Sequence, residues 1–155
     1  MKAGMDTARF GVHWRSLAAI IVVSISVGLY AVVSSESNGA PVENAPRRFS
    51  EQIEEIRTGG GSRRIHDLIP GSWTTVHVFD MESLVRESVE KDVGYSLDMP
   101  ETYLNSMGAL FVFVDDDSVV RAAAVYTSRF NEYHSTGDTD SMIEFDSTTG
   151  YFRLK

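Results

Sequence analysis

The residues of this chain best suited to metal or proton-transfer chemistry are the three histidines of residues 49–155, namely His66, His77 and His134. A zinc ion takes three or four protein ligands, often at short spacings such as i, i+4 on a helix. No two of these histidines are close in the sequence, and the chain has no cysteine that could supply a thiolate. The sequence therefore predicts no metal site and implies no cofactor.

The same histidines could act in a hydrolase if the fold placed a carboxylate beside one of them. Residues 16–155 contain twenty-one acidic side chains, so the sequence alone cannot single out the carboxylate. Ser72, in Pro-Gly-Ser-Trp, lacks the Gly-x-Ser-x-Gly elbow of a serine nucleophile. The alternative function is therefore a small exported hydrolase that uses His77 or His134 with a carboxylate. It requires a concave pocket around one imidazole.

Two acidic stretches, residues 115–117 and 138–140, carry carboxylates of the kind that bind calcium. Neither stretch has the alternating Asp-x-Asp-x-Asp-Gly pattern of a calcium-binding loop. Aspartate is also common in tight turns, where its side chain accepts hydrogen bonds from the nearby backbone. Both stretches are therefore predicted to be solvent-exposed turns.

Aromatic residues indicate contact with another protein. The residues that we expect to contact a partner are Trp73, Phe79, Phe130 and Tyr133. Exposed aromatic side chains often anchor protein–protein contacts. For Trp73 and Phe79, the alternative is that both pack beneath helices. The favoured function is a non-catalytic protein-binding module, such as an inhibitor, an immunity factor or an accessory of an envelope complex.

An uncharged stretch of twenty residues, Ser16–Ser35, predicts where these side chains work. A helix of that length reaches about 30 Å, the thickness of the hydrocarbon core of a membrane. Residues 1–15 carry three basic residues against one acid, and the positive-inside rule keeps such a segment in the cytoplasm. We therefore expect a single-pass anchor in the bacterial inner membrane, with the C-terminal part on the periplasmic or extracellular side.

A cleaved signal peptide is the alternative interpretation of this stretch. Signal peptides have an apolar core of roughly 7–15 residues followed by a small-x-small cleavage site. The apolar core here, from Leu17 to Val33, is longer, and its best cleavage site is Val32-Val33-Ser34. The retained anchor is therefore favoured over a secreted protein.

The charge of the chain is divided at the predicted membrane segment. Residues 1–15 have a net charge of +2 and the remainder has −10, which together give the −8 of the whole chain. An acidic domain is a poor nucleic-acid binder, because contact with phosphates requires a basic surface. We therefore expect no nucleic acid as partner. Another envelope protein fits better, and a basic protein would complement the charge.

Beyond the anchor, the sequence predicts a flexible tether at residues 36–48 and one domain at residues 49–155. The tether contains turn-forming residues without an apolar period. The elements predicted in the domain are helices at 50–57, 63–68 and 81–92, strands at 73–79, 109–114 and 119–126, a polar loop at 130–139, and a hairpin of 141–145 with 151–154. This order predicts an α+β fold, an antiparallel-rich sheet with helices on one face.

A resemblance accompanies the stretch Leu68-Ile-Pro-Gly-Ser-Trp-Thr-Thr-Val-His-Val-Phe79, which precedes a helix and a Phe-Val-Phe-Val strand with an acidic turn. This arrangement resembles small uncharacterised bacterial envelope proteins that carry a Trp-x-x-Val-x-Val-Phe strand after a leader. The resemblance covers roughly residues 65–126, and this chain lacks the lipobox cysteine that many such proteins have. It implies an exported domain and supplies no catalytic residues.

Overall fold

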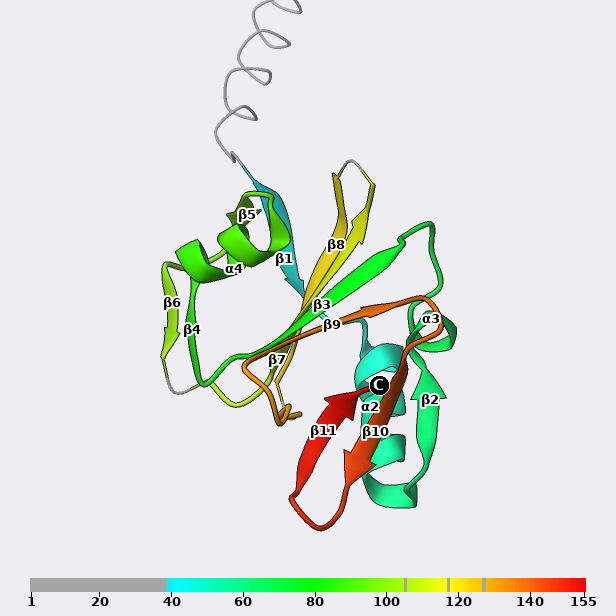
Figure 1. Ribbon diagram of the computed structural model, residues 1–155. Coiled ribbons are helices and arrows are strands. Elements are labelled where there is room, and N and C mark those ends of the chain that lie inside the picture. Colours follow the sequence, from blue (N-terminus) through cyan, green and yellow to red (C-terminus); the bar gives the residue numbers. More distant parts are fainter. Residues whose placement is uncertain (1–38, 105, 117, 127) are drawn as a thin grey trace, which may run out of the picture. The chain divides into compact units, whose positions relative to one another are not determined.

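A six-stranded mixed sheet organises the described part of the computed structural model, residues 39–155 except 105, 117 and 127 (Figure 1). From edge to edge its strands are β5 (Leu97–Asp98), β1 (Ala40–Asn44), β8 (Ser118–Val125), β7 (Ala109–Asp115), β3 (Thr75–Asp80) and β9 (His134–Asp138). Strand β1 is parallel to both of its neighbours, and the other pairs are antiparallel. The α+β fold class is thus confirmed, with a sheet-rich core and few helices.

Two smaller sheets accompany the main one. Strands β2 (Ser62–Arg64), β10 (Met142–Asp146) and β11 (Tyr151–Leu154) form an antiparallel sheet, and β4 (Ser83–Val85) pairs with β6 (Thr102–Leu104). The predicted hairpins around residues 115–118 and 147–150 are confirmed as β7–β8 and β10–β11.

The central strand β7 has a hydrophobic core on each face, as its uninterrupted apolar sequence predicts. Phe111 and Phe113 belong to one buried cluster, whereas Leu110 and Val112 belong to the other. Consecutive side chains of a strand point to opposite faces, so a strand buried on both sides needs apolar residues throughout.

The helices cover both faces of the main sheet, whereas the sequence predicted them on one face. Helices α2 (Arg47–Gly59) and α3 (Ile65–Leu68) contribute buried residues to the cluster that contains Phe111. Helix α4 (Arg86–Val93) contributes Val89 and Val93 to the opposite cluster. A sheet that is apolar on both sides requires such a cover on each.

The predicted tether and domain boundary are wrong for residues 40–48. Residues 40–44 form β1, which lies between β5 and β8, and α2 already begins at Arg47, after Pro46, whereas the predicted helix begins at residue 50. Val42 packs against the core that contains Leu110. Strand β1 has the sequence Ala-Pro-Val-Glu-Asn, and proline, glutamate and asparagine are uncommon in strands, so the stretch has the composition of a loop.

Two further corrections concern the borders of the helix at 81–92 and the polar loop at 130–139. Residues 83–85 are strand β4, so the helix begins only at Arg86. The preceding strand β3 ends at Asp80, one residue later than predicted. Residues 134–138 are the edge strand β9. Met81 and Leu84 are buried, and their spacing of three residues is also that of the apolar face of a helix, which explains the first error. The side chains of β9 are polar because this strand lies at an exposed edge of the sheet, which explains the second.

None of the helices in the described residues is long and apolar enough to cross a membrane. The predicted membrane segment Ser16–Ser35 lies outside these residues.

Candidate functional site

The structure separates the four aromatic residues predicted to bind a partner. Trp73, Phe79 and Phe130 are 3%, 0% and 3% exposed, so they belong to the cores and cannot be contact anchors. The indole N–H of Trp73 donates a 2.8 Å hydrogen bond to the backbone oxygen of Ile69. Tyr133, in contrast, is 48% exposed, and its ring lies edge-on to Phe79 with 6.4 Å between the centroids.

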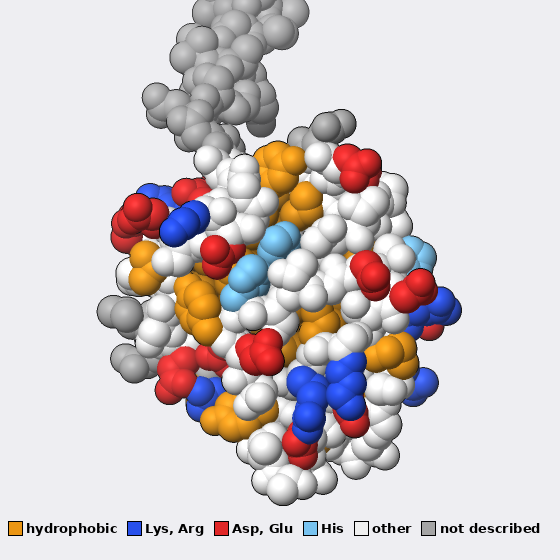
Figure 2. Space-filling view, in the orientation of Figure 1, with side chains coloured by type: hydrophobic (Ala, Val, Ile, Leu, Met, Phe, Trp, Pro, Cys, Tyr) orange, Lys and Arg blue, Asp and Glu red, His pale blue; other side chains and the backbone are white. Residues whose placement is uncertain are grey.

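A chain of polar contacts joins β3, β9 and α4. Nδ1 of His77 lies 3.0 Å from Nε2 of His134, and Nδ1 of His134 lies 3.5 Å from Oδ2 of Asp92. The hydroxyl of Thr136 is 3.3 Å from the same Nε2 of His134. We refer to Asp92, His134 and His77 as the histidine relay. Figure 2 shows two touching histidine side chains at the molecular surface, with acidic and hydrophobic side chains around them.

Strand register explains why these side chains meet. Antiparallel pairing places His77 opposite Thr136 and Phe79 opposite His134. Side chains two residues apart share one face of a sheet, so all four lie on the same face. Asp92 reaches this face from the last turn of α4.

The rings of the relay are aligned with one another. The planes of His77 and His134 are 8° apart with 5.3 Å between their centroids, and the facing nitrogens lie within hydrogen-bond distance. The His134 ring also stacks on Phe79, with 4.3 Å between centroids and 3° between planes. Asp92 favours a proton on Nδ1 of His134, which leaves Nε2 to accept the proton of His77 Nδ1.

The environment opposes a positive charge on His77. Burial lowers the pKa of His77 below its ordinary value of 6.5, and the nearby imidazole of His134 lowers it further. The carboxylate of Asp92 acts in the opposite direction and raises the pKa of His77. The outcome is a neutral imidazole at His77 that resists protonation.

A cleft of about 410 Å³ lies beside the relay, at the end of β3. Its lining consists of Asp80, Glu82, Ser83, Arg129, Phe130, Asn131, Glu132, Tyr133 and Tyr151. Three carboxylates against one guanidinium make this lining acidic. Tyr133 connects the cleft to the relay, because it precedes His134 and its ring contacts Phe79.

Arg129 organises the wall of this cleft. Its guanidinium pairs with Glu82 and lies 3.8 Å from Oδ2 of Asp80. Its Cζ atom also lies 5.3 Å from the centroid of the Tyr151 ring, within the range of a cation–π contact. Glu132 is exposed and accepts a 3.2 Å hydrogen bond from the Ser135 hydroxyl.

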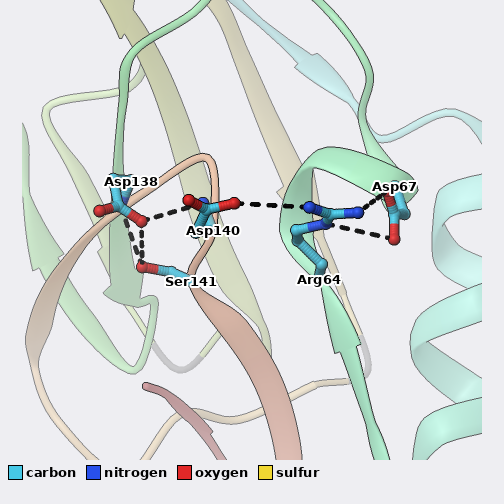
Figure 3. Close-up of polar contacts among 5 residues, drawn as sticks. All are labelled: Arg64, Asp67, Asp138, Asp140 and Ser141. Carbon is cyan, nitrogen blue, oxygen red and sulfur yellow. Dashed lines mark hydrogen bonds and ion pairs between the residues drawn. The ribbon is translucent and has the colours of Figure 1, made fainter.

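The predicted turn at residues 138–140 is confirmed by its contacts (Figure 3). Oδ1 of Asp138 accepts hydrogen bonds from the backbone N–H of Asp140 and from the Ser141 hydroxyl, and these bonds lower the pKa of Asp138. Arg64 lies 3.4 Å from both Asp140 and Asp67. These carboxylates thus hold a turn against β2 and α3. In the described residues no three histidine, cysteine or acidic side chains gather as a metal site.

Sequence reasoning identified His77, His134 and Tyr133 but missed Asp92 and the acidic cleft. Asp92 is one of many acids in the chain, and only the packing of α4 brings it to His134. The spacing of two residues between His134 and Thr136 could have indicated that both lie on one face of a strand. Family models, curated proteins and solved structures were compared with the chain, and none of them matches it.

Proposed function

We propose that this chain is a single-pass protein of the bacterial inner membrane whose C-terminal domain binds another envelope protein without catalysing a reaction. Residues 16–35 are the membrane anchor in this proposal, the N-terminus is cytoplasmic, and the domain is periplasmic or extracellular. The observation that carries the binding function is the exposed Tyr133 at the edge of the acidic cleft.

Tyr133 has the properties of a contact residue. A tyrosine ring provides a large and rigid apolar surface with a polar tip, and it loses little side-chain entropy on binding. Its ring is fixed from below by Phe79, and its backbone oxygen accepts a 3.0 Å hydrogen bond from the N–H of Asp80. The side chain is therefore presented to solvent from a rigid base.

The charge of the cleft indicates the chemistry of the partner. Arg129 pairs with both Asp80 and Glu82. Glu132 accepts its hydrogen bond from the neutral Ser135 hydroxyl, so its negative charge adds to that of the cleft. Complementary charge directs association and selects partners. We therefore propose that the partner presents a basic segment with Lys or Arg, and that this chain acts as an inhibitor, an immunity factor or an accessory of an envelope complex.

Site-specific photo-crosslinking in intact cells tests this proposal. A photoreactive phenylalanine analogue replaces Tyr133 in the full-length protein, and the control carries it at Val120 on β8. These two residues have similar exposure, 48% and 45%. We expect a defined protein adduct from position 133 that is absent from position 120. The same adducts from both positions, or none from position 133, would contradict the proposal.

Charge reversal tests the basic partner separately. Glu132→Lys changes the cleft, and Glu55→Lys makes the same change on the exposed surface of α2. We expect Glu132→Lys to reduce the adduct at position 133 about tenfold, equivalent to about 1.4 kcal/mol, with little effect of Glu55→Lys. Equal effects of both variants would point to overall charge instead of the cleft.

The histidine relay favours the hydrolase as a second candidate function. His134 is paired with a carboxylate, and the relay leaves Nε2 of His77 as a base that could take a proton from water. Neither histidine lines the 410 Å³ cleft, so a substrate would have to bind elsewhere on this face. A screen of ester, peptide and phosphate substrates, run with the full-length protein and with His77→Gln, decides between the functions. Turnover that depends on His77 would replace the non-catalytic proposal, and no turnover would remove the hydrolase.

A further inference from the structure

The hydrogen bond between His77 and His134 tolerates one added proton but not two. Its acceptor is an unprotonated ring nitrogen, and such a nitrogen becomes a donor when it takes up a proton. With both rings protonated, both facing nitrogens carry hydrogen at a separation of 3.0 Å, and both rings are positively charged. The rings must then separate.

Two groups surround the ring of His134. Asp92 lies 3.5 Å from its Nδ1, and the face of its ring rests on Phe79, a position that favours a cation. Singly protonated His134 can still donate from Nε2 to Nδ1 of His77. The bond therefore breaks only when both rings carry an added proton.

The groups that surround His77 can be named element by element. Among the described residues, the charged groups that act on it are His134 from β9 and Asp92 from α4. The neighbour across β7 is the apolar Val112, and the neighbour across β9 is the neutral Thr136. Apart from Asp92, none of these neighbours carries a negative charge that would stabilise a second proton on the two histidines.

Loss of this bond would affect the edge of the sheet. In the described residues, β9 is hydrogen-bonded in the main sheet to β3 alone, and His134 is its first residue. The relay adds a side-chain link from β9 to His77 of β3 and to Asp92 of α4. Tyr133 immediately precedes this point, so the side chain at the cleft depends on the same attachment.

We propose that the histidine relay is an acid-operated latch, which holds the start of β9 on the sheet and opens when both imidazoles are protonated. The latch itself is independent of any partner. Its consequence, weaker presentation of Tyr133 in acid, rests on the protein-binding function proposed above. The direction of the pH dependence follows from His77, whose pKa is lowered on folding. The unfolded chain takes up this proton more readily, so stability is lost as the pH falls below about 6.5.

Amide hydrogen exchange of the full-length protein in lipid nanodiscs tests the latch at about pH 7.5 and about pH 5, after correction for the intrinsic exchange rate. In the wild type we expect the protection of the β9 amides to fall by up to about tenfold per pH unit as the pH falls from about 6.5 towards the lowered pKa of His77. His77→Gln should remove this loss, because its amide can donate to His134 but never gains charge. His66→Gln is the matched control, since His66 contacts the backbone of Gly71 outside the relay, and it should behave as the wild type.

A second measurement keeps the proposal testable if His77→Gln fails to fold. An NMR titration of the wild-type imidazoles should show two coupled steps, with β9 protection lost at the more acidic one. Unchanged protection in acid, loss at the first step, or equal loss in wild type and His77→Gln would overturn the latch.

Photo-crosslinking from position 133 at both pH values separates the two proposals. An opening latch without any adduct at either pH rejects the binding function and not the latch.

Discussion

The backbone N–H of Phe130 donates a 3.3 Å hydrogen bond to Oδ2 of Asp80, which lies 50 residues earlier in the chain. The other carboxylate oxygen, Oδ1, accepts a 2.9 Å hydrogen bond from the N–H of Glu82. Asp80 is only 9% exposed. One nearly buried carboxylate thus closes the end of β3 and fixes the segment that forms the wall of the cleft.

Replacing Asp80 should therefore destabilise the domain. Asp80→Ala leaves two backbone N–H groups without their acceptor, and the free energy of unfolding should fall by about 1–3 kcal/mol. Asp80→Asn should cost less, because the amide oxygen can still accept one of these bonds. Urea unfolding measures both variants, and Asp98→Ala, at an exposed position, is the control. Equal effects of Asp80→Ala and Asp98→Ala would show that the two hydrogen bonds contribute little.

The N-terminal boundary of the domain gives a second prediction. The fragment Ser37–Lys155 corresponds to one compact unit and retains β1, whereas Phe49–Lys155 lacks it. Without β1, residues 122–124 of β8 keep β7 but lose the strand on their other side, and β5 is detached from the sheet. We expect cooperative urea unfolding of the longer fragment, and exposed hydrophobic surface without a cooperative transition for the shorter one. Equal midpoints would show that β1 is dispensable.

Two glycine substitutions should have opposite effects. A Cβ atom on Gly108 would lie 2.4 Å from the backbone oxygen of Val125, and neighbouring backbone cannot easily move away. Gly59, the last residue of α2, has no atom within 4 Å of the same position. Gly108→Ala should therefore destabilise by about 1–3 kcal/mol or more, and Gly59→Ala should stabilise by about 0.4–1 kcal/mol. Thermal unfolding checks both signs, and a stable Gly108→Ala would mean that the β7–β8 pair can shift.

The middle of the sheet could be predicted from the sequence because burial leaves a clear pattern there. Strand β7 is apolar at six consecutive positions, and β8 follows it after an acidic turn. The edge strands leave no such pattern. Strand β9 is polar throughout, and its pairing with β3 depends on tertiary contact across the chain. Strand β1 is short, and its parallel partners are far away in the sequence.

The candidate site could be predicted only in part for the same reason. Residue types alone identify His77 and His134 as chemically capable, but they do not identify Asp92 among the acids. Aromatic character does not separate exposed Tyr133 from buried Phe79 either. Phe79 follows two valines that alternate on β3, and it faces the core that contains Leu110, which α4 covers. Tertiary packing decides which face of the strand is covered, and the sequence of the strand alone does not predict it.

The proposed membrane anchor should be sensitive to charge. Val22→Lys combined with Val27→Asp places two charges near the centre of residues 16–35. Each charge at the centre of a membrane helix costs about 2.5–3.5 kcal/mol of insertion free energy. We expect the double variant in the soluble cytoplasmic fraction and the wild type in the membrane fraction. A conservative control, Val22→Leu with Val27→Ile, should remain in the membrane. Unchanged fractionation of the charged variant would contradict an anchor at these residues.

The mass of the mature protein separates the anchor from a signal peptide. Both interpretations share the same orientation, because each assigns Lys2, Arg9 and Arg15 to the cytoplasm. They differ in whether the peptide bond near Ser34 is cut. The uncharged stretch exceeds the usual length of a signal core, so we expect intact-mass measurement of the membrane fraction to show a chain that retains residues 16–35. A periplasmic chain that starts near Ser35 would show cleavage and would make the protein a secreted one, with β1 and the histidine relay unchanged.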